Sequence, residues 1–373
     1  MNTARLIIAS SEQCADLYWA TRFYVPDPIA FLEYRGKKIL IASDLEVSRA
    51  RKEADVDLVL SQADYEKKLR KSGRAIRPGD VLDAVLRERK IKVLQVPTYF
   101  PFHQAELLRK RGYRLEVVPD PFYPEREIKT LAEKKHITDA LRATEAGIQA
   151  GIEVLRKSKI KGGKIYRNGA VLTSEALRGV IEATMMEKGA LGQHTIVACG
   201  KQAADPHCRG TGPLYAHQTI VLDVFPKSME TGYHGDITRT VVKGRASATL
   251  KKMYATVKKS QEAGIKAIRD GVDAAKVHGD VCRVLDASGF KTGLLDGKPQ
   301  GFIHSTGHGL GLDIHESPRV SRLSNKLKTG HVVTVEPGLY YEKLGGIRIE
   351  DVVYVTKKGC DVLTRIPKVF EIA

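Results

Sequence analysis

Four carboxylates lie at the ends of short predicted strands in the second half of the sequence. They are Asp223 after Thr219–Leu222, Asp236 after a Gly232/Gly235 turn, Glu336 after Val332–Val335 and Glu350 after Gly345–Ile349. One such carboxylate could simply cap a turn, but burying it is costly unless a cation or hydrogen-bond donors compensate its charge. Four inward carboxylates cannot all ionise in a core without strong positive charge. The pattern therefore predicts a site for two divalent metal ions.

Alternation along the predicted strand Ile347–Val355 separates two neighbouring acids. Successive side chains of a strand point to opposite faces, so Arg348 and Glu350 share one face and Asp351 points away from it. We therefore expect Glu350 in the site, Arg348 beside it, and a structural role for Asp351.

A glycine-rich segment adds three histidines, His304, His308 and His315, with glycines between them at 307, 309 and 311. Glycine allows backbone and metal to approach closely. A lone histidine is more often a satisfied core residue than a ligand, but three histidines beside four strand carboxylates favour a ligand. One imidazole among oxygen ligands suits Mn(II), Fe(II) or Co(II), and suits Zn(II) less well because zinc favours nitrogen and sulfur.

The composition is typical of a cytoplasmic enzyme. Of the 373 residues, 42% are hydrophobic and 28% are charged, as in ordinary globular proteins. No apolar run approaches the roughly 20 residues that a membrane span needs, and the first residues do not form a secretory signal. The five cysteines are scattered without a CxxC motif, which indicates reduced thiols. We expect a cytoplasmic protein with no membrane partner.

The formal net charge of +17 raises the question of an anionic partner. The basic residues are spread in short clusters, such as Arg109–Arg111 and Lys157–Lys164. Dispersed charge of this kind predicts a solvated basic surface and no nucleic-acid partner.

Prolines at 119, 121 and 124 mark the best boundary in the chain, since Val118–Pro124 cannot continue a regular element. We place one domain at residues 1–125 and a second at 126–373. The first contains a hairpin of Ala30–Arg35 and Lys38–Ala42 turned by Gly36. For the second we predict helices at Ile128–Leu155, Ser174–Lys188 and Ser247–Asp270, a loop at Lys157–Asn168, and strands at Thr219–Phe225, Asp236–Val242, Val332–Glu336 and Ile347–Val355.

The candidate ligands occur in sequence words that match a known family. The words are Gly-Asp-Ile-Thr-Arg-Thr, Gly-His-Gly-Leu-Gly-Leu, Val-Glu-Pro-Gly and Ile-Arg-Ile-Glu-Asp. Each is a weak signal alone, but in this order they resemble the pita-bread metallopeptidases, which include methionine aminopeptidase, aminopeptidase P and prolidase. The resemblance implies an α/β (α+β) fold, with a pita-bread catalytic domain at 126–373, a smaller creatinase/prolidase-type domain before it, and a homodimer.

The resemblance also implies roles for the five ligands. Asp223 would bind one metal, His308 and Glu336 would bind the other, and Asp236 and Glu350 would bridge both. Glu336 would in addition act as general base.

Further residues take roles from the same resemblance. His315 and His207 would donate hydrogen bonds to substrate and reaction intermediate. His304, Arg319 and Arg348 would contact substrate, with Arg348 also orienting a bridging carboxylate. Arg319 would bind the C-terminal carboxylate of a dipeptide through two parallel hydrogen bonds. Arg322 is a competing candidate for this role, and pairing with a surface acid is the alternative role of Arg319.

The branch that the chain resembles implies an Xaa-Pro dipeptidase acting on dipeptides or short peptides, with two Mn(II) ions. Aminopeptidase P activity on longer peptides is the alternative. The N-terminal domain argues against a methionine aminopeptidase, and the intact ligands argue against a creatinase-like metal-free enzyme and an inactive nucleic-acid-binding protein. The chain departs from the family at Phe225, where glycine is usual, at the longer turn Pro226–Thr231, and at an extended segment Lys161–Asn168.

Overall fold

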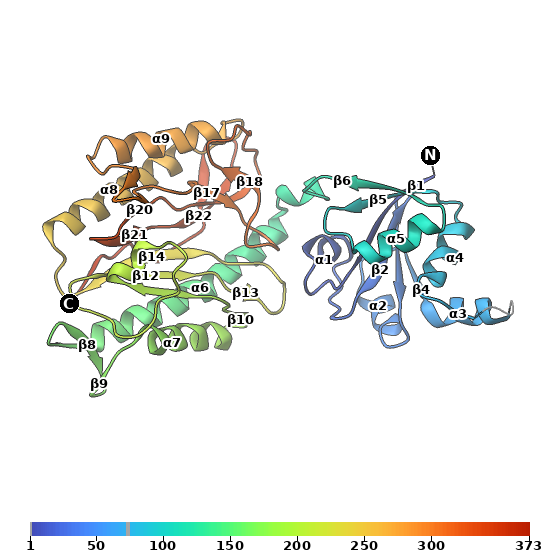
Figure 1. Cartoon of the computed structure of the whole chain (residues 1–373), viewed down its shortest axis with the longest axis horizontal. Coiled ribbons are helices and arrows are strands. Elements are labelled where there is room, and N and C mark those ends of the chain that lie inside the picture. The colour runs from blue at the N-terminus through green and yellow to red at the C-terminus, as the bar shows by residue number, and fades with distance from the viewer. Residues whose placement is uncertain (1, 72–74) are drawn as a thin grey trace. The chain divides into compact units, whose positions relative to one another are not determined.

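A computed structural model describes residues 2–71 and 75–373 of the chain. The chain divides into two compact units, the first ending at Arg126 and the second beginning at Glu127. Each unit has its own sheets and core, and Figure 1 labels their elements.

The first unit is built on one six-stranded sheet with the order β4-β3-β2-β1-β5-β6. Its strands are β1 (Thr3–Ala9), β2 (Ile29–Tyr34), β3 (Lys37–Ala42), β4 (Leu58–Ser61), β5 (Val93–Pro97) and β6 (Arg114–Val118). Its helices are α1 (Ala15–Thr21), α2 (Val47–Glu53), α3 (Gln62–Lys71), α4 (Asp80–Glu88) and α5 (Phe102–Lys110). The predicted hairpin is confirmed, because β2 and β3 pair antiparallel around Arg35 and Gly36, both with positive φ.

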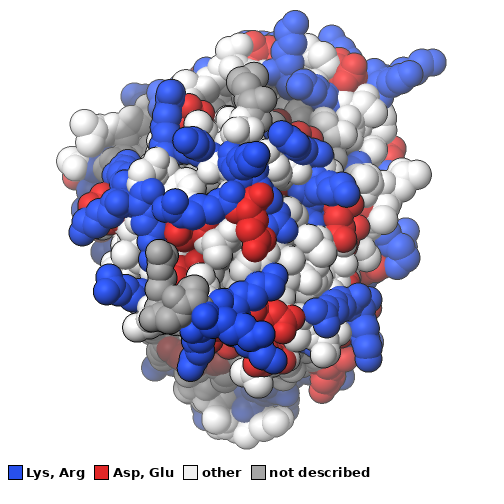
Figure 2. Space-filling view, turned by 90° about the vertical axis from the view of Figure 1, so that its right-hand side faces the viewer, with Lys and Arg blue, Asp and Glu red and all other residues white. Residues whose placement is uncertain are grey.

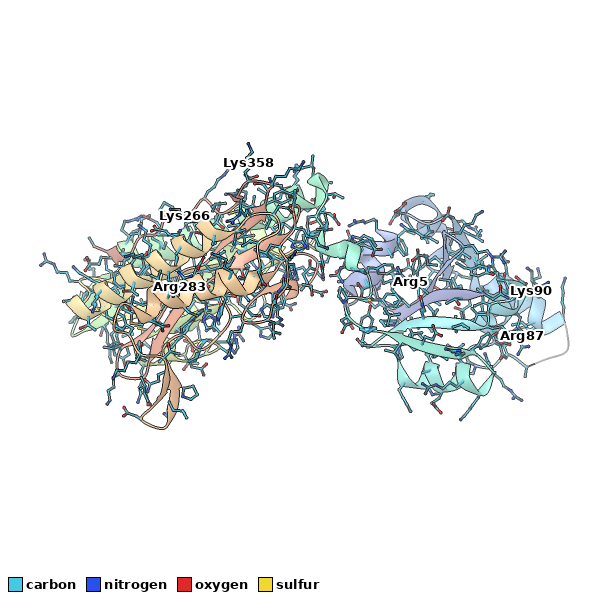
Figure 3. The ribbon with its side chains drawn as sticks, turned by 90° about the horizontal axis from the view of Figure 1, so that it is seen from above. Arg5, Arg87, Lys90, Lys266, Arg283 and Lys358 are labelled. Carbon is cyan, nitrogen blue, oxygen red and sulfur yellow. The ribbon has the colours of Figure 1, made fainter. Side chains whose placement is uncertain are left out.

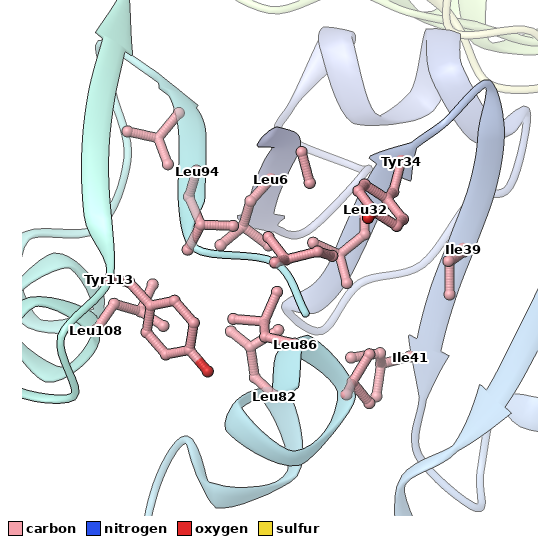
Figure 4. Close-up of a cluster of buried hydrophobic side chains, with 14 of the residues drawn as sticks. Leu6, Leu32, Tyr34, Ile39, Ile41, Leu82, Leu86, Leu94, Leu108 and Tyr113 are labelled. Carbon is pink, nitrogen blue, oxygen red and sulfur yellow. The ribbon is translucent and has the colours of Figure 1, made fainter. Parts of the chain in front are cut away.

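Strand alternation gives this sheet two apolar faces. Leu6 and Leu32 pack with Leu82 and Leu86 of α4 on one face, as Figure 4 shows. Their chain neighbours belong to the opposite core, which includes Ile7 and residues of α1 and α2. The sheet is therefore buried on both sides, as expected for an α/β layer.

The second unit places two helix pairs over its sheets. The helices are α6 (Leu131–Lys157), α7 (Ser174–Glu187), α8 (Ala248–Ala267) and α9 (Ala274–Asp286). α6 packs with α7 and against β12 and β14, whereas α8 packs with α9 and against β19 and β21. The long helix α6 begins with a capping box, in which Thr130 and Glu133 each accept a hydrogen bond from the other's backbone.

Two sheets and a hairpin carry the centre of this unit. The four-stranded sheet has the order β11-β12-β14-β24, with β11 (Ile196–Cys199), β12 (Thr219–Val224), β14 (Ile237–Lys243) and β24 (Glu371–Ile372). The five-stranded sheet has the order β18-β17-β19-β22-β23, with β17 (Gly307–Gly309), β18 (Glu316–Val320), β19 (Val332–Val335), β22 (Asp351–Val355) and β23 (Cys360–Val362). The hairpin joins β20 (Gly338–Tyr341) and β21 (Gly345–Arg348).

Three local predictions for this unit are wrong. Lys157–Asn168 is largely a hairpin, in which β7 (Lys159–Lys161) and β8 (Lys164–Arg167) pair around two glycines with positive φ. The predicted strand Ile347–Val355 is two strands, β21 and β22, that belong to different sheets. The helix predicted from Ile128 begins at Leu131, so Ile128 lies before α6.

Charged side chains are distributed over the surface. Figure 2 shows Lys and Arg with Asp and Glu among them on the face in view. Figure 3 places labelled cations on separate elements of the second unit, with Lys266 on α8, Arg283 on α9 and Lys358 between β22 and β23. Within the described residues, no helix is both long and apolar enough to cross a membrane.

Candidate metal centre

Neighbouring strands of the second unit bring the candidate ligands together. β12 and β14 pair antiparallel with Asp223 opposite Thr238, and Asp236 directly precedes β14. Glu336 directly follows β19, and its backbone N–H donates to the carbonyl of Thr306 at 2.8 Å. Glu350 lies where the chain passes from β21 to β22.

Asp236, His308 and Glu350 form the tightest group, with one ligand atom from each within 4.8 Å of the others. His308 Nε2 lies 3.6 Å from Asp236 Oδ2 and 3.3 Å from Glu336 Oε1. Thr238 connects the group to Asp223, because its Oγ1 lies 2.8 Å from both Asp223 Oδ1 and Glu350 Oε2. The predicted ligands thus converge on one buried site.

The electrostatics of this site call for a cation. Burial, reinforced by the charges of neighbouring carboxylates, raises the pKa of Asp236 and of Glu350 well above their ordinary values. Among the described residues, the buried Oε1 of Glu350 has no hydrogen-bond partner. Three buried donors with one imidazole and an orphaned carboxylate oxygen fit a divalent metal ion.

Glu336 behaves differently from the other two acids. Burial alone would raise the pKa of Glu336, but the hydrogen bond and charge of His308, together with His304 and Arg348, lower it to about 2. Its carboxylate is therefore ionised at neutral pH and can accept a proton.

Arg348 is buried beneath the site, and its predicted partner is wrong. Its Nη2 donates to Asp223 Oδ2 at 2.5 Å, its Nη1 to the hydroxyl of Tyr340 at 2.8 Å, and its Nε to Thr238 Oγ1 at 3.1 Å. The expected hydrogen bond to a bridging carboxylate is replaced by one to Asp223, because β21 ends at Arg348 and its side chain reaches across to β12.

The three other histidines lie around this centre in different states. His315 is exposed as a whole residue, but its ring packs edge-on against the ring of His308, with the ring centroids 4.3 Å apart. His207 is exposed as well, and its charge acts on both His304 and His315. Burial lowers the pKa of His304 and of His315, so both are neutral at neutral pH.

His304 is held by the protein at both ring nitrogens. Nδ1 lies 2.7 Å from the carbonyl of Ser305, and Nε2 lies 3.0 Å from the hydroxyl of Tyr340. This leaves no free ring nitrogen for a substrate hydrogen bond. Arg319, in contrast, is exposed on β18, and its charge acts on His315.

Asp351 lies away from the ligand atoms in a separate buried network. Arg239 Nη2 donates to its Oδ1 at 2.8 Å, while Lys368 Nζ and Gln261 Nε2 lie 2.7 and 3.2 Å from its Oδ2. The structure thus joins Asp351 to Arg239 under the sheet.

The glycines around His308 serve strand packing. A Cβ on Gly307 would lie 2.0 Å from the carbonyl oxygen of Thr334, and one on Gly309 would lie 2.4 Å from that of Ser317. β17 therefore fits between β18 and β19 only with glycine at these positions.

Tyr340 and His234 are among the residues near the site that were missed from the sequence. Tyr340 connects Arg348 to His304, and nothing in the sequence distinguishes it from a core tyrosine. His234 lies two residues before Asp236, and the charges of Lys227, Asp313 and His315 act on it. The two-residue period of a strand was a usable signal for His234, because it places this residue on the same face as Asp236.

Comparisons with known proteins agree on one family. The model of Metallopeptidase family M24 matches residues 135–357. An Xaa-Pro dipeptidase of Pyrococcus horikoshii is 31% identical over 279 residues, which cover 74% of each chain. The solved structure of an Xaa-Pro dipeptidase from Bacillus anthracis superposes with a TM-score of 0.81 at 25% identity, covering 99% of this chain and 94% of that one. An X-Pro aminopeptidase from Thermotoga maritima shares the fold, with a TM-score of 0.82 at 24% identity over 99% and 97% of the two chains.

Proposed function

Because the chain belongs to metallopeptidase family M24, we propose that it is an Xaa-Pro dipeptidase. The observation that carries the proposal is the convergence of Asp236, His308 and Glu350 in one buried group, in a chain that is similar over 74% of its length to an Xaa-Pro dipeptidase. Glu336 and Asp223 border that group through His308 and Thr238.

For the metal we propose two divalent ions, with Mn(II) ahead of Co(II), Fe(II) and Zn(II). Asp223 would hold one ion, His308 and Glu336 the other, and Asp236 and Glu350 both. A bound divalent ion lowers the pKa of a water molecule and polarises the scissile carbonyl. Oxygen-rich ligation with one imidazole supports this choice of metal.

The chain's own residues would bind the substrate and move the proton. The ionised Glu336 carboxylate would accept a proton from the attacking water and pass it to the leaving proline nitrogen. His315 and His207 can each donate a ring N–H to the carbonyl oxygen or to substrate. Arg319 would bind the substrate carboxylate. An Xaa-Pro bond has no N–H, so the site needs no acceptor at that position.

The experiment compares Ala-Pro, Ala-Pro-Gly and Met-Ala-Ser as substrates of the Mn(II)-loaded protein. A dipeptidase should cleave Ala-Pro fastest and leave Met-Ala-Ser intact. Faster cleavage of Ala-Pro-Gly would instead identify an Xaa-Pro aminopeptidase. Cleavage of Met-Ala-Ser alone would refute selectivity for proline.

Aminopeptidase P activity remains the second candidate because the fold is shared with the X-Pro aminopeptidase from Thermotoga maritima. The proposal further includes a cytoplasmic location, a homodimer and no nucleic-acid partner. The intermingled acidic and basic side chains in Figure 2 support the last of these. A gel shift that resists physiological salt would contradict it.

A further inference from the structure

The hairpin that carries Asp223 and Asp236 continues past the ends of its two strands. Within the ladder, Asp223 is opposite Thr238 and Val224 is opposite Ile237. Beyond it, the N–H of Gly235 donates to the carbonyl of Pro226 at 3.0 Å.

The same register holds nearer the tip of the hairpin. Lys227 and His234 form an isolated antiparallel β-bridge through their backbones. The N–H of Ser228 donates to the carbonyl of Tyr233 at 2.9 Å. Each of these pairs keeps the alignment of Asp223 with Thr238. The alignment therefore places Phe225 directly opposite Asp236.

Residues opposite each other in an antiparallel pair have side chains on the same face, with Cβ atoms about 5 Å apart. In this hairpin that face carries the ligands, as the 2.8 Å contact between Thr238 Oγ1 and Asp223 Oδ1 demonstrates. Phe225 follows Asp223 by two residues and so lies on this face. Its ring is half-buried, which leaves apolar surface uncovered next to Asp236.

The tip of the hairpin borders the other side of the site. The N–H of His234 donates to the carbonyl of Gly311 at 2.9 Å, and its ring interacts with the backbone of Phe225. The segment after Gly311 leads to His315, whose ring touches that of His308. Phe225 is thus part of the rim at the ligand-bearing end of the hairpin.

An Xaa-Pro dipeptide has opposite charges at its two ends. Its carboxylate belongs to the proline residue and is attracted to a cation such as the exposed Arg319. Its amino group belongs to the first residue, at the opposite end of the dipeptide, and so lies toward the hairpin of Asp223 and Asp236. The side chain of the first residue then comes next to Phe225.

We propose that Phe225 is a specificity-determining residue, whose ring forms an apolar wall for the side chain of the first substrate residue. The inference rests on the proposed function and extends it to a preference for large apolar first residues over glycine. A large apolar side chain of the substrate would bury the part of the Phe225 ring that is exposed to solvent, and this burial supplies the binding free energy for the preference.

The test measures kcat/KM for Leu-Pro and Gly-Pro with the Mn(II)-loaded protein and three variants. Phe225→Ala should lower the Leu-Pro to Gly-Pro ratio by about 10-fold or more, the usual scale for apolar pocket contacts. Phe225→Leu keeps an apolar wall and should retain most of the ratio. Met229→Ala, at an exposed position in the turn of the same hairpin, should leave the ratio unchanged. Equal losses on both substrates in Phe225→Ala, with the ratio intact, would overturn the proposal.

A binding measurement separates this inference from the proposed function. Hydrolysis is followed with the wild type, and calorimetry of Mn(II)-loaded Glu336→Gln and Glu336→Gln/Phe225→Ala reports the affinity ratio for the two dipeptides while turnover is slowed by about 10²-fold. A ratio that depends on Phe225 without any hydrolysis would support the wall and refute the dipeptidase. Hydrolysis with no such dependence in either rate or affinity would refute the wall and leave the dipeptidase. Absence of binding to either protein would refute both.

Discussion

Asp351→Asn tests whether the acid next to Glu350 stabilises the fold without taking part in the chemistry. Asp351 and Arg239 are 2% and 1% exposed, and they form a buried ion pair with N–O distance 2.8 Å. The substitution keeps the shape of the side chain and removes its charge. Arg239 then stays buried as a cation without a counter-charge.

The loss of unfolding free energy in Asp351→Asn depends on the hydrogen bonds that Arg239 keeps. Removing one partner of a buried pair costs about 3–5 kcal/mol. Arg239 still donates to the carbonyls of Thr238, Glu350 and Ile366, and Lys368 can turn its charge toward water. We therefore expect the lower end, about 3 kcal/mol of unfolding free energy. For a unit of this size, that corresponds to a loss of roughly 6–12 °C in Tm.

Thermal unfolding followed by circular dichroism measures this loss, and kcat is measured well below the transition. We expect the lower Tm together with a nearly unchanged kcat, because Asp351 lies away from the ligand atoms. Asp361→Asn is the matched control, since it breaks the exposed pair with Lys134 and should cost no more than about 1 kcal/mol. Equal Tm losses in the two variants, or a kcat loss as large as that of Glu336→Gln, would refute the reasoning.

Four further predictions concern the site and its surroundings. Glu336→Gln should lower kcat by about 10²-fold or more with a smaller change in substrate affinity, as steady-state and binding measurements can show. Chelation should abolish hydrolysis and added Mn(II) or Co(II) should restore it; full activity in protein shown by elemental analysis to be metal-free would contradict the mechanism. Arg319→Ala should weaken binding of Xaa-Pro dipeptides by about 1.5–3 kcal/mol and spare Xaa-Pro-Xaa tripeptides, so equal losses in calorimetry would exclude the carboxylate contact. Burial and the nearby charges of Lys129 and Lys328 lower the pKa of His331 to about 4. The unfolded chain therefore binds a proton at this residue more readily than the folded chain does. The contribution of His331 to the free energy of unfolding is fully present above pH 6.5 and falls by about 3 kcal/mol as the pH drops toward 4. His331→Asn should flatten this fall in denaturant titrations, and the exposed His194→Asn should not.

The sequence predicted the ligand-bearing elements because their signals are local. Each carboxylate lies at the end of a short buried strand, and β12, β14 and β19 lie within one or two residues of the expected bounds. α6, α7 and α8 likewise follow from their apolar periodicity. These elements depend on local pattern, which a single sequence displays.

The structure departs from the sequence predictions where tertiary partners decide. The prediction from strand alternation treated Arg348 and Glu350 as parts of one continuous strand. In the structure, the chain leaves the β20–β21 hairpin at Arg348 and enters the five-stranded sheet at Asp351. Periodicity cannot show such a change of sheet, and therefore it cannot show that Arg348 reaches Asp223. The hairpin β7–β8 was missed for another reason. Ile165 is its one buried side chain, so its sequence has no apolar alternation to detect.

The pairing of charges under the site indicates why a divalent ion would bind at this position. Asp351 is compensated by Arg239 and Asp223 by Arg348. In the described part of the chain, Asp236 and Glu350 form no ion pair with Lys or Arg. Burial, followed by the charges of neighbouring carboxylates, raises the pKa of both. The protein thus places arginines beside Asp351 and Asp223, whereas, among the described residues, Asp236 and Glu350 lie near His308 without an arginine or lysine partner. A divalent ion at this point would supply the missing positive charge, and the arrangement of the buried arginines directs it there.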